Sequence, residues 1–258
     1  MTSRGGGRLT RRGLLAAGAV LPLAAACAPS PVASPTPAAA PPVPTAASTT
    51  PPAPTRTPGS PADELVRATS GRPEVALTFH GAGDPELARK VLTGFADRGA
   101  AVTVLAIGTW LQQYPDVAKT VTGNGHEIGN HTWSHPDLTA LGTAGVRAEI
   151  ERCRDRLAAL TGGPGAFFRP SAAQHATAAV RTLAGAAGYA TVLSYDIDSE
   201  DYTDPGAAAI RRNVRAATAG SVVSMHLGHP GTLEALPGLL DDLAARGLTP
   251  VTAGRLFR

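Results

Sequence analysis

From residue 74 onward, short apolar runs alternate with longer segments whose apolar residues recur every three or four positions. The runs are rich in Val, Ile, Leu and Phe, as buried parallel strands are, and they read EVALTF, VTVLAI, AFFR, TVLSYDI and GSVVSMHL. The periodic segments predict helices over 85–98, 143–160, 177–187, 207–217 and 233–246. This order predicts an α/β domain in which helices cover a parallel sheet or barrel, with functional groups at the carboxyl ends of the strands.

The first 27 residues have a different pattern, which is typical of an export signal. A basic start is followed by an apolar run over 14–26 and small residues before Cys27. This run is shorter than the ~20 apolar residues that span a bilayer. The stretch TRRGLL resembles a twin-arginine export motif, and LAAAC resembles a lipobox in which Cys27 carries lipid. Cleavage in the Ala-rich segment without lipidation is the alternative.

Residues 28–62 are dominated by Pro, Ala, Ser and Thr and contain one charged residue, Arg56. Such a segment has too little apolar side chain to form a core, which predicts an extended, disordered tether. Residues 63–258 are then the folded domain. We expect an exported protein, held at the extracellular face of the membrane by a lipid on Cys27, or secreted.

Charge and cysteine content exclude some functions. The chain has 23 Lys and Arg against 20 Asp and Glu, but residues 1–62 hold five of the arginines and no acid. The domain is therefore mildly acidic, and the high pI is no evidence for binding nucleic acid. Cys153, the second of two cysteines, lies on the apolar face of the helix predicted over 143–160 and is expected in the core. No protein partner is indicated.

The stretch GHEIGNHTWSHPDL carries the first indication of chemistry. His131 and His135 are four residues apart, and on a helical turn both imidazoles could reach one metal ion. With the preceding Gly-Asn, the stretch resembles the G-N-H-[ST]-x-x-H motif of the NodB-type polysaccharide deacetylases, carbohydrate esterase family 4.

Three further stretches resemble motifs of that family, in the same order along the chain. FFRPSAAQH is similar to the arginine motif F-R-P-P-Y-G, and YDIDSEDYTDP keeps the Asp of an Asp-Trp motif at Asp201, with Tyr202 in place of Trp. GSVVSMHL resembles a strand ending in Leu-His-Asp, with His226 as the histidine. The resemblance covers 73–258 and implies an α/β fold, a distorted (β/α) barrel of the polysaccharide deacetylase type.

The resemblance also implies a mechanism. These enzymes hold a divalent metal, commonly zinc, through one Asp and two His, and a metal-bound water attacks an N-acetyl carbonyl. By position, His131 and His135 would be metal ligands and His226 the general acid. Asp201 would keep His226 protonated, and Arg169 would orient the group on the side of the base. An ordinary ion pair is the alternative for Arg169 and Asp201.

The first family motif, T-F-D-D-G-P, has lost both carboxylates. The aligned stretch is TFHGAGDP, in which His80 replaces the base and Gly81 replaces the metal-binding Asp. In one hypothesis His80 is a third metal ligand, because three protein ligands plus water is a normal catalytic zinc arrangement. In another His80 is the base, with metal binding weak or completed by Asp84, although Asp84 before Pro85 favours a helix N-cap. In the third the site is inactive.

Retention of all the other motif histidines favours a rebuilt site over an abandoned one. His175, Asp198 and a backbone N–H near residue 172 are further supporting groups. The expected function is a metal-dependent hydrolase that removes N-acetyl groups from cell-envelope polysaccharide, either peptidoglycan or a chitin-like N-acetylglucosamine polymer. The alternatives are an inactive glycan-binding or envelope-assembly lipoprotein, and a metal amidohydrolase for a non-sugar amide.

Overall fold

The structure is a computed structural model that describes residues 59–258. Its strands are β1 (Asp63–Leu65), β2 (Glu74–Gly81), β3 (Thr103–Ala106), β4 (Glu127–Asn130), β5 (Phe167–Phe168), β6 (Thr191–Leu193), β7 (Ile197–Asp198), β8 (Val222–His226) and β9 (Thr249–Val251). Its α-helices are α1 (Pro85–Asp97), α2 (Gly108–Gln113), α3 (Asp116–Gly123), α4 (Thr143–Thr161), α5 (Ala178–Ala186), α6 (Ala207–Val214), α7 (Pro230–Ala245) and α8 (Ala253–Leu256).

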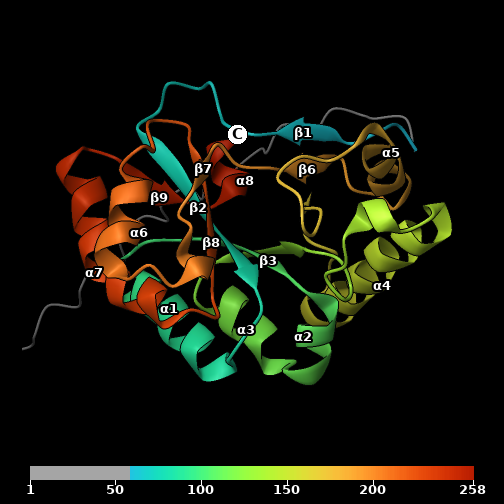
Figure 1. Ribbon diagram of the computed structural model, residues 1–258, viewed down its shortest axis with the longest axis horizontal. Coiled ribbons are helices and arrows are strands. Elements are labelled where there is room, and N and C mark those ends of the chain that lie inside the picture. Colours follow the sequence, from blue (N-terminus) through green and yellow to red (C-terminus); the bar gives the residue numbers. More distant parts are fainter. Residues whose placement is uncertain (1–58) are drawn as a thin grey trace, which may run out of the picture. The chain divides into compact units, whose positions relative to one another are not determined.

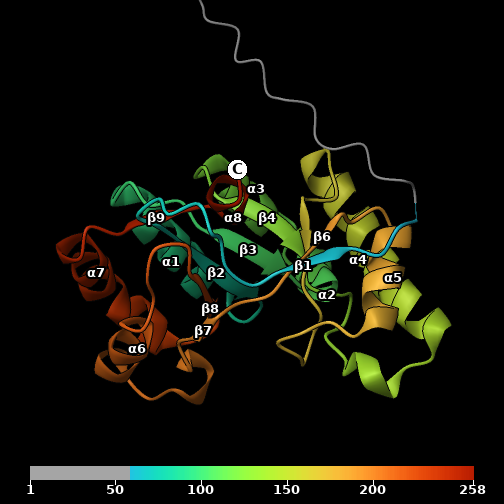
Figure 2. The ribbon, with the colours of Figure 1, turned by 90° about the horizontal axis from the view of Figure 1, so that it is seen from above.

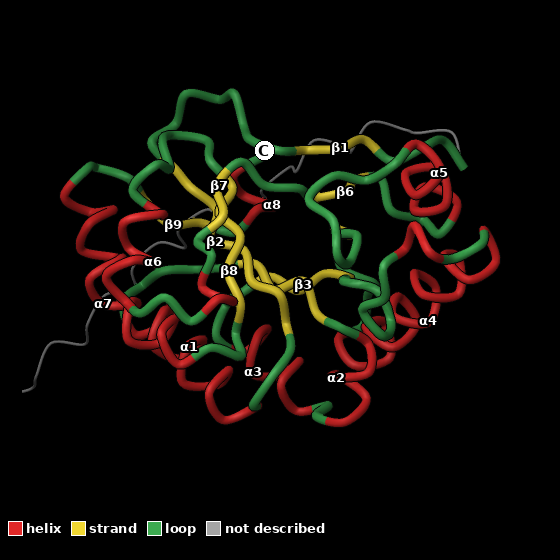
Figure 3. The backbone as a smooth tube through the Cα atoms, viewed as in Figure 1, coloured by secondary structure: helices red, strands yellow, loops and turns green. Residues whose placement is uncertain are grey.

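The strands form one curled parallel sheet, which confirms the predicted fold class. Their order is β1-β6-β5-β4-β3-β2-β8-β7, and β9 pairs with the start of β2. Every ladder between these strands is parallel. Within residues 59–258 no ladder joins β1 to β7, so the barrel stays open there. Helices line the outside of this curved sheet (Figures 1 and 3).

The five predicted helices and four of the five predicted strands are present, with ends that differ by a few residues. The fifth predicted strand, TVLSYDI, is divided into β6 and the start of β7. The pattern did not predict α2 and α3, which have six and eight residues and follow one another directly after β3. It also did not predict β4, whose sequence EIGN contains a single large apolar residue. The unpredicted edge strand β1 has only three residues.

The alternation of side chains along β2 divides the core into layers. Val75, Leu77 and Phe79 belong to the cluster that also includes residues of α1, α3 and α7, outside the sheet. The intervening residues Ala76 and Thr78 point to the other face, because successive side chains on a strand alternate. Figure 2 shows the helices outside the sheet from a second direction. His80, at the carboxyl end of β2, therefore faces the interior of the curl.

The short helix α8 fills the opposite end of this interior. Ala253 and Leu256 are fully buried and belong to a cluster with Ala76, Leu105 and Leu193. The cluster fills the amino-terminal end of the barrel with apolar side chains. Polar groups can then gather only at the carboxyl end, where His80 lies.

Candidate functional site

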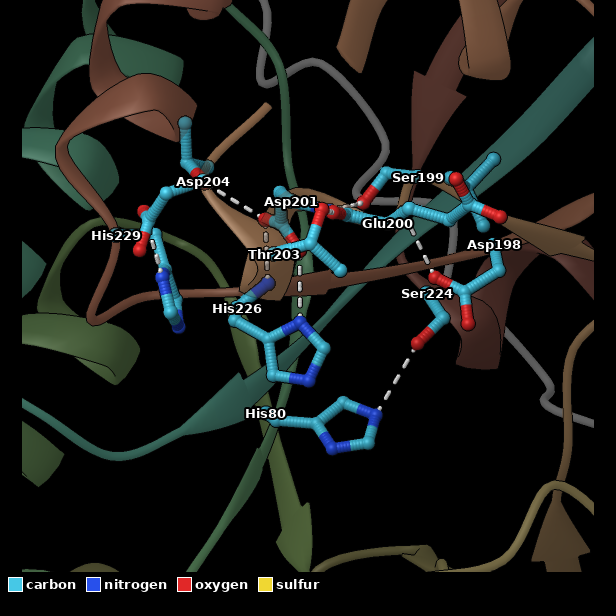
Figure 4. Close-up of polar contacts among 12 residues, drawn as sticks. His80, Asp198, Ser199, Glu200, Asp201, Thr203, Asp204, Ser224, His226 and His229 are labelled. Carbon is cyan, nitrogen blue, oxygen red and sulfur yellow. Dashed lines mark hydrogen bonds and ion pairs between the residues drawn. The ribbon is translucent and has the colours of Figure 1, made fainter. Parts of the chain in front are cut away.

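Strand register brings two of the histidines together. His80 on β2 and His226 on β8 are register partners, and their ring centroids are 4.3 Å apart. The carboxyl ends of parallel strands meet at one edge of a sheet, so residues 146 positions apart become neighbours at this rim. Figure 4 shows the two imidazoles side by side.

His131 is fixed by the backbone at the end of β4. Its N–H donates to the carbonyl of Ala106, and the Arg169 N–H donates to the carbonyl of Asn130. The ring is fully buried, and Nδ1 lies 3.0 Å from the Arg169 carbonyl oxygen, so Nδ1 carries the proton and donates it. Nε2 is buried and has no hydrogen-bond partner among the described residues. A buried lone pair of this kind is what a metal ion would satisfy.

His135 reaches the same place through a turn, so the predicted helical turn over 131–135 is wrong. Thr132 and His135 have φ of 66° and 60°, which is left-handed backbone. The side chain of Asn130 accepts from the Thr132 N–H, and the Thr132 hydroxyl accepts from the His135 N–H. These local bonds replace helical ones, and Pro136 disfavours helical backbone in the residue before it.

The three histidines that one hypothesis placed around a metal do lie together. One nitrogen from each of His80, His131 and His135 lies within 4.8 Å of the other two. Nitrogens bound tetrahedrally to zinc are ~3.4 Å apart, so a small rotation of the exposed His135 suffices. The ring centroid of His131 lies 4.4 Å from that of His80 and 4.8 Å from that of His135. The donor set and the unpartnered Nε2 of His131 fit a divalent ion.

These imidazoles are neutral at ordinary pH. Burial, together with the positive charge of neighbouring groups, holds the pKa of His80 and of His131 well below the usual value of 6.5. Burial also lowers the pKa of His135. Only an unprotonated imidazole binds metal, so the site does not lose ligands to protonation near neutral pH.

His226 is paired with a buried carboxylate. Asp201 is fully buried, and its Oδ1 lies 2.7 Å from Nδ1 of His226. Its Oδ2 accepts from the backbone N–H of His226 and from the hydroxyl of Thr232. Burial alone would raise the pKa of Asp201, but these bonds and the charge of His226 more than offset it and lower the pKa. Asp201 therefore stays ionised, and the other ring nitrogen of His226 is left to face the cavity.

Arg169 is fully buried behind His80. Its Nη1 lies 3.3 Å from Nε2 of His80, and its other N–H groups donate to Thr78 and to the carbonyls of Leu193 and Ser194. No ion pair joins it to a carboxylate of the described residues, so it does not pair with Asp201. Burial lowers the pKa of Arg169 to about 10, and the guanidinium remains charged at neutral pH.

A cavity of about 360 Å³ opens onto these groups. Its lining residues are His80, His135, Ala172, Ala173, Gln174, Tyr195, Asp198, Tyr202, Ser224 and His226. Asp198 is the one acidic side chain among them. Tyr202 is 51% exposed and stands beside His226, with ring centroids 5.4 Å apart. Ala172, with φ of 55°, places its backbone at the cavity wall.

Three of the remaining expectations can be compared with the structure. The side chain of Asp84 accepts from the Leu87 N–H as the N-cap of α1, and this is the structural role that the sequence favoured. His175 does not line the cavity, since its ring is exposed and lies 3.3 Å from Glu64. Cys153 is in the core as expected, and burial raises the pKa of its thiol to about 12.

Sequence reasoning missed several residues of the site. Ser224, Tyr195 and Gln174 line the cavity, and Asn130 shapes the histidine turn. Ser224 lies two residues before His226 on the same strand, and side chains two apart share a face. That spacing could have identified it. Tyr195 lies between β6 and β7, at the start of the stretch YDIDSEDYTDP, but the resemblance drew attention to Asp201 and not to this position.

The export signal, the lipidation of Cys27 and most of the tether fall outside the described residues. Within residues 59–258, no helix combines the length and the apolar character needed to cross a bilayer.

Comparison with known proteins supports the resemblance. A family model described as polysaccharide deacetylase matches residues 67–192. A chitin deacetylase from Pestalotiopsis is 30% identical over 202 residues, which cover 75% of this chain and 67% of the relative.

Solved structures share the fold. A peptidoglycan N-acetylglucosamine deacetylase has a TM-score of 0.70 and 27% identity, over 75% of this chain and 92% of that one. A carbohydrate esterase family 4 pseudoenzyme from Bacillus anthracis has a TM-score of 0.71 and 23% identity, over 76% of this chain and 69% of that one. Sequence and fold agree, and the chain belongs to the polysaccharide deacetylase family.

Proposed function

We propose that this protein is a metal-dependent hydrolase that removes N-acetyl groups from N-acetylglucosamine residues of cell-envelope polysaccharide, peptidoglycan or a chitin-like polymer. One observation carries the proposal. His80, His131 and His135 converge beside the Asp201–His226 pair, with His80, His135 and His226 lining one cavity and His131 buried behind it. The names of the chitin and peptidoglycan deacetylases to which the chain is similar support the substrate class.

The metal would be held by His80, His131 and His135 and is proposed to be zinc. A divalent ion bound there supplies a Lewis acid that polarises the amide carbonyl and acidifies a water molecule. The ligand set contains no carboxylate, so it is less negative than a set of one Asp and two His. A more positive site favours ionisation of the water, and a weaker base is then sufficient.

The protein groups supply the proton transfers. Asp201 holds Nδ1–H of His226, so Nε2 of His226 faces the cavity and donates to the leaving amine. Asp198 is the acidic side chain of the cavity wall and is the proposed acceptor of the proton from water. Ala172 lines the cavity, and its backbone N–H is the proposed donor to the developing oxyanion. Arg169 packs behind His80, with Nη1 3.3 Å from Nε2 of His80, and places a positive charge beside the proposed site.

The experiment is a metal and acetate assay on the purified full chain. We expect about one zinc ion per chain, and release of acetate from N-acetylglucosamine oligomers or peptidoglycan. His131→Ala should abolish both, and His226→Ala should abolish acetate release alone. Absence of both metal and acetate in the unmodified protein would overturn the proposal. Metal without acetate would favour an amidohydrolase for a non-sugar amide.

A variant at position 80 separates the two hypotheses in which the site is active, with His80 either a metal ligand or the base. If His80 is a ligand, His80→Ala loses metal as completely as His131→Ala does. If His80 is the base, His80→Ala keeps its metal and loses turnover. We propose the ligand role, because one nitrogen of His80 lies within the same 4.8 Å group as those of the other two histidines.

A non-catalytic glycan-binding or envelope-assembly protein is the second candidate. The observation that favours it is the loss of both carboxylates at positions 80 and 81. Tyr202, exposed at the cavity mouth, could stack on a sugar ring in either case. Binding of N-acetylglucosamine oligomers without turnover, by a protein that holds no metal, would establish this alternative.

We also propose that residues 1–27 direct export, that Cys27 carries lipid, and that the Pro-, Ala-, Ser- and Thr-rich segment from residue 28 tethers the domain to the membrane. The predicted end of this tether at residue 62 lies too far along the chain, because Ala62 is fully buried in the domain core. The basic start, the apolar run and the LAAAC stretch support export and lipid anchoring. Cell fractionation tests it: the native chain should be in the membrane fraction, and Cys27→Ser should shift it to the medium. Retention of Cys27→Ser in the membrane fraction would contradict lipid anchoring.

A further inference from the structure

His80 lies beside two groups that can hydrogen-bond with different tautomers of its imidazole. Its Nε2 lies 3.3 Å from Nη1 of Arg169 and 3.2 Å from Oγ of Ser224. A guanidinium only donates hydrogen bonds, so a bond from Arg169 requires an unprotonated Nε2 and leaves the ring proton on Nδ1. A serine hydroxyl donates or accepts, so Ser224 can bond to either tautomer.

Only the tautomer of His80 with its proton on Nε2 leaves an accessible lone pair, on Nδ1, for a metal ion. Nε2 is enclosed by Arg169 and Ser224, while no hydrogen bond within the described part of the chain uses Nδ1 of His80. Nδ1 is therefore the ligand atom, and it can bind a metal only when the ring proton is on Nε2. That N–H then needs an acceptor, which Arg169 cannot be.

We propose that Ser224 is the positioning residue that makes His80 a metal ligand. Its Oγ accepts the Nε2–H of His80 and so selects the tautomer whose Nδ1 is free for the metal. The proposal rests on the proposed function, in which His80 is one of three ligands. Ser224 itself does not contact the metal.

His131 shows the same arrangement with a different acceptor. The carbonyl of Arg169 accepts Nδ1–H of His131, and the opposite nitrogen, Nε2, is buried without a partner. Each buried ligand therefore has an oxygen acceptor on one nitrogen and a free lone pair on the other. This pairing of a metal-binding imidazole with an outer acceptor fixes both ring orientation and tautomer.

The surroundings of Ser224 suit an acceptor. Ser224 is 1% exposed and is the register partner of Thr78 on β2, so its backbone cannot drift from His80. Tyr195 lines the same cavity, where burial raises the pKa of its phenol and the nearby Ser224 side chain partly offsets that rise. Figure 4 shows the Ser224 hydroxyl directed at the His80 ring, with the Asp198 carboxylate beside it.

Zinc affinity of the full chain provides the first test. Removal of such an acceptor typically weakens metal binding about 10- to 100-fold. Ser224→Ala should therefore weaken zinc binding by that factor in a competition titration, and Ser224→Thr, which keeps a hydroxyl, should restore most of it. The melting temperature of the metal-free variants shows whether each is folded. Wild-type zinc affinity in a folded Ser224→Ala protein would overturn the proposal.

The tautomer of His80 provides a second test that needs no substitution. In a long-range ¹H–¹⁵N spectrum, zinc-loaded wild-type protein should carry the His80 proton on Nε2. A proton on Nδ1 in the zinc-loaded protein would overturn the proposal even if Ser224→Ala does not fold. His80→Ala separates the proposed ligand set from the proposed role of Ser224. If His80→Ala binds zinc normally, the ligand set is wrong. If it loses zinc and Ser224→Ala does not, only the role of Ser224 is wrong.

Discussion

Asp201 accepts three hydrogen bonds, two from His226 and one from Thr232. A carboxylate can accept all three because both of its oxygens are acceptors. An asparagine would turn an N–H group toward at least one of those donors and would no longer offer the His226 ring a negatively charged acceptor. We expect Asp201→Asn to lower acetate release on the order of 10²-fold or more, which is the range for loss of general acid catalysis. Zinc content should be unchanged, because Asp201 is outside the proposed ligand set.

Thr232→Val is the matched control for Asp201→Asn. It removes one donor to Oδ2 and leaves both bonds from His226 in place. It should lower the free energy of unfolding by about 1 kcal/mol and change turnover little. Equal losses of turnover in the two variants would show that Asp201 acts through the packing of this region and not through His226.

The lowered pKa of the buried His131 predicts how the stability of the metal-free protein depends on pH. Its pKa in the folded, metal-free protein is well below the usual 6.5, because burial disfavours the charged ring. Above pH 6.5 the ring is neutral in both folded and unfolded chains and contributes no pH dependence. As the pH falls below 6.5, the unfolded chain binds a proton that the folded chain does not. The free energy of unfolding should therefore decrease by about 1.4 kcal/mol per pH unit for this group.

Urea unfolding of metal-free protein between pH 7 and pH 5 measures this dependence. His131→Asn, which keeps an N–H donor near the Arg169 carbonyl, is the comparison. The variant should be less sensitive to acid than the wild type over that interval. Identical slopes of stability against pH would mean that His131 does not resist protonation in the folded chain.

At the scale of the strand, β2 places positions 80 and 81 on opposite faces. A Cβ atom at Gly81 would lie 2.9 Å from the Ala106 backbone and 3.1 Å from the Trp110 ring. Position 81 therefore faces β3 and α2, away from the interior of the curl that His80 faces. The contact with the backbone of β3 leaves little room for any side chain.

This geometry predicts that the family carboxylate cannot be restored at position 81. Gly81→Asp should destabilise the fold, because the overlap involves backbone atoms and a carboxylate would be buried among apolar groups. It should bind zinc no better than the wild type. His80→Asp places a carboxylate on the interior face and should retain more zinc than His80→Ala. Thermal unfolding and zinc titration measure both effects.

Gly81→Ala separates the two causes of that destabilisation. It keeps the steric overlap and adds no charge, so it should cost part of what Gly81→Asp costs. Tighter zinc binding by a stable Gly81→Asp protein would contradict the strand geometry, since it would require the side chain at 81 to reach the interior.

The elements differ in how well the sequence alone could predict them. The apolar run of β2 and the long periodic helices α1, α4 and α7 could be predicted from pattern. The turn that carries His131 and His135 could not, because side-chain bonds from Asn130 and Thr132 set its backbone. An H-x-x-x-H spacing is compatible with both a helix and this turn, and only local hydrogen bonding decides between them.

At the scale of the molecule, the site depends on strand order, which no local pattern contains. His80 lies on β2, His131 follows β4 and His226 ends β8, and strand order brings the carboxyl ends of these strands to one rim of the sheet. The motif resemblance identified those three, since it carries information about the whole fold. Ser224 and Tyr195 lie within the stretches that resemble family motifs but at positions that those motifs do not single out. They join the site because β8 and the β6–β7 loop meet at the cavity.

The same strand order makes the proposed metal ion a cross-link of the whole sheet. His80 belongs to β2, while His131 and His135 follow β4, with β3 between them. An ion that binds only the folded chain adds RT ln(1 + [L]/Kd) to the free energy of unfolding, about 2.7 kcal/mol at 100 times Kd. For a domain of this size that corresponds to a rise in melting temperature of roughly 5–10 °C.

Thermal unfolding with zinc, and after removal of zinc with EDTA, should show this rise and its reversal. His131→Ala should melt at the same temperature under both conditions, because it lacks the buried ligand. His175→Ala is the matched control, since His175 is an exposed histidine outside the cavity and its variant should respond to zinc as the wild type does. A rise that persists in His131→Ala would show that zinc stabilises the chain from somewhere other than this site.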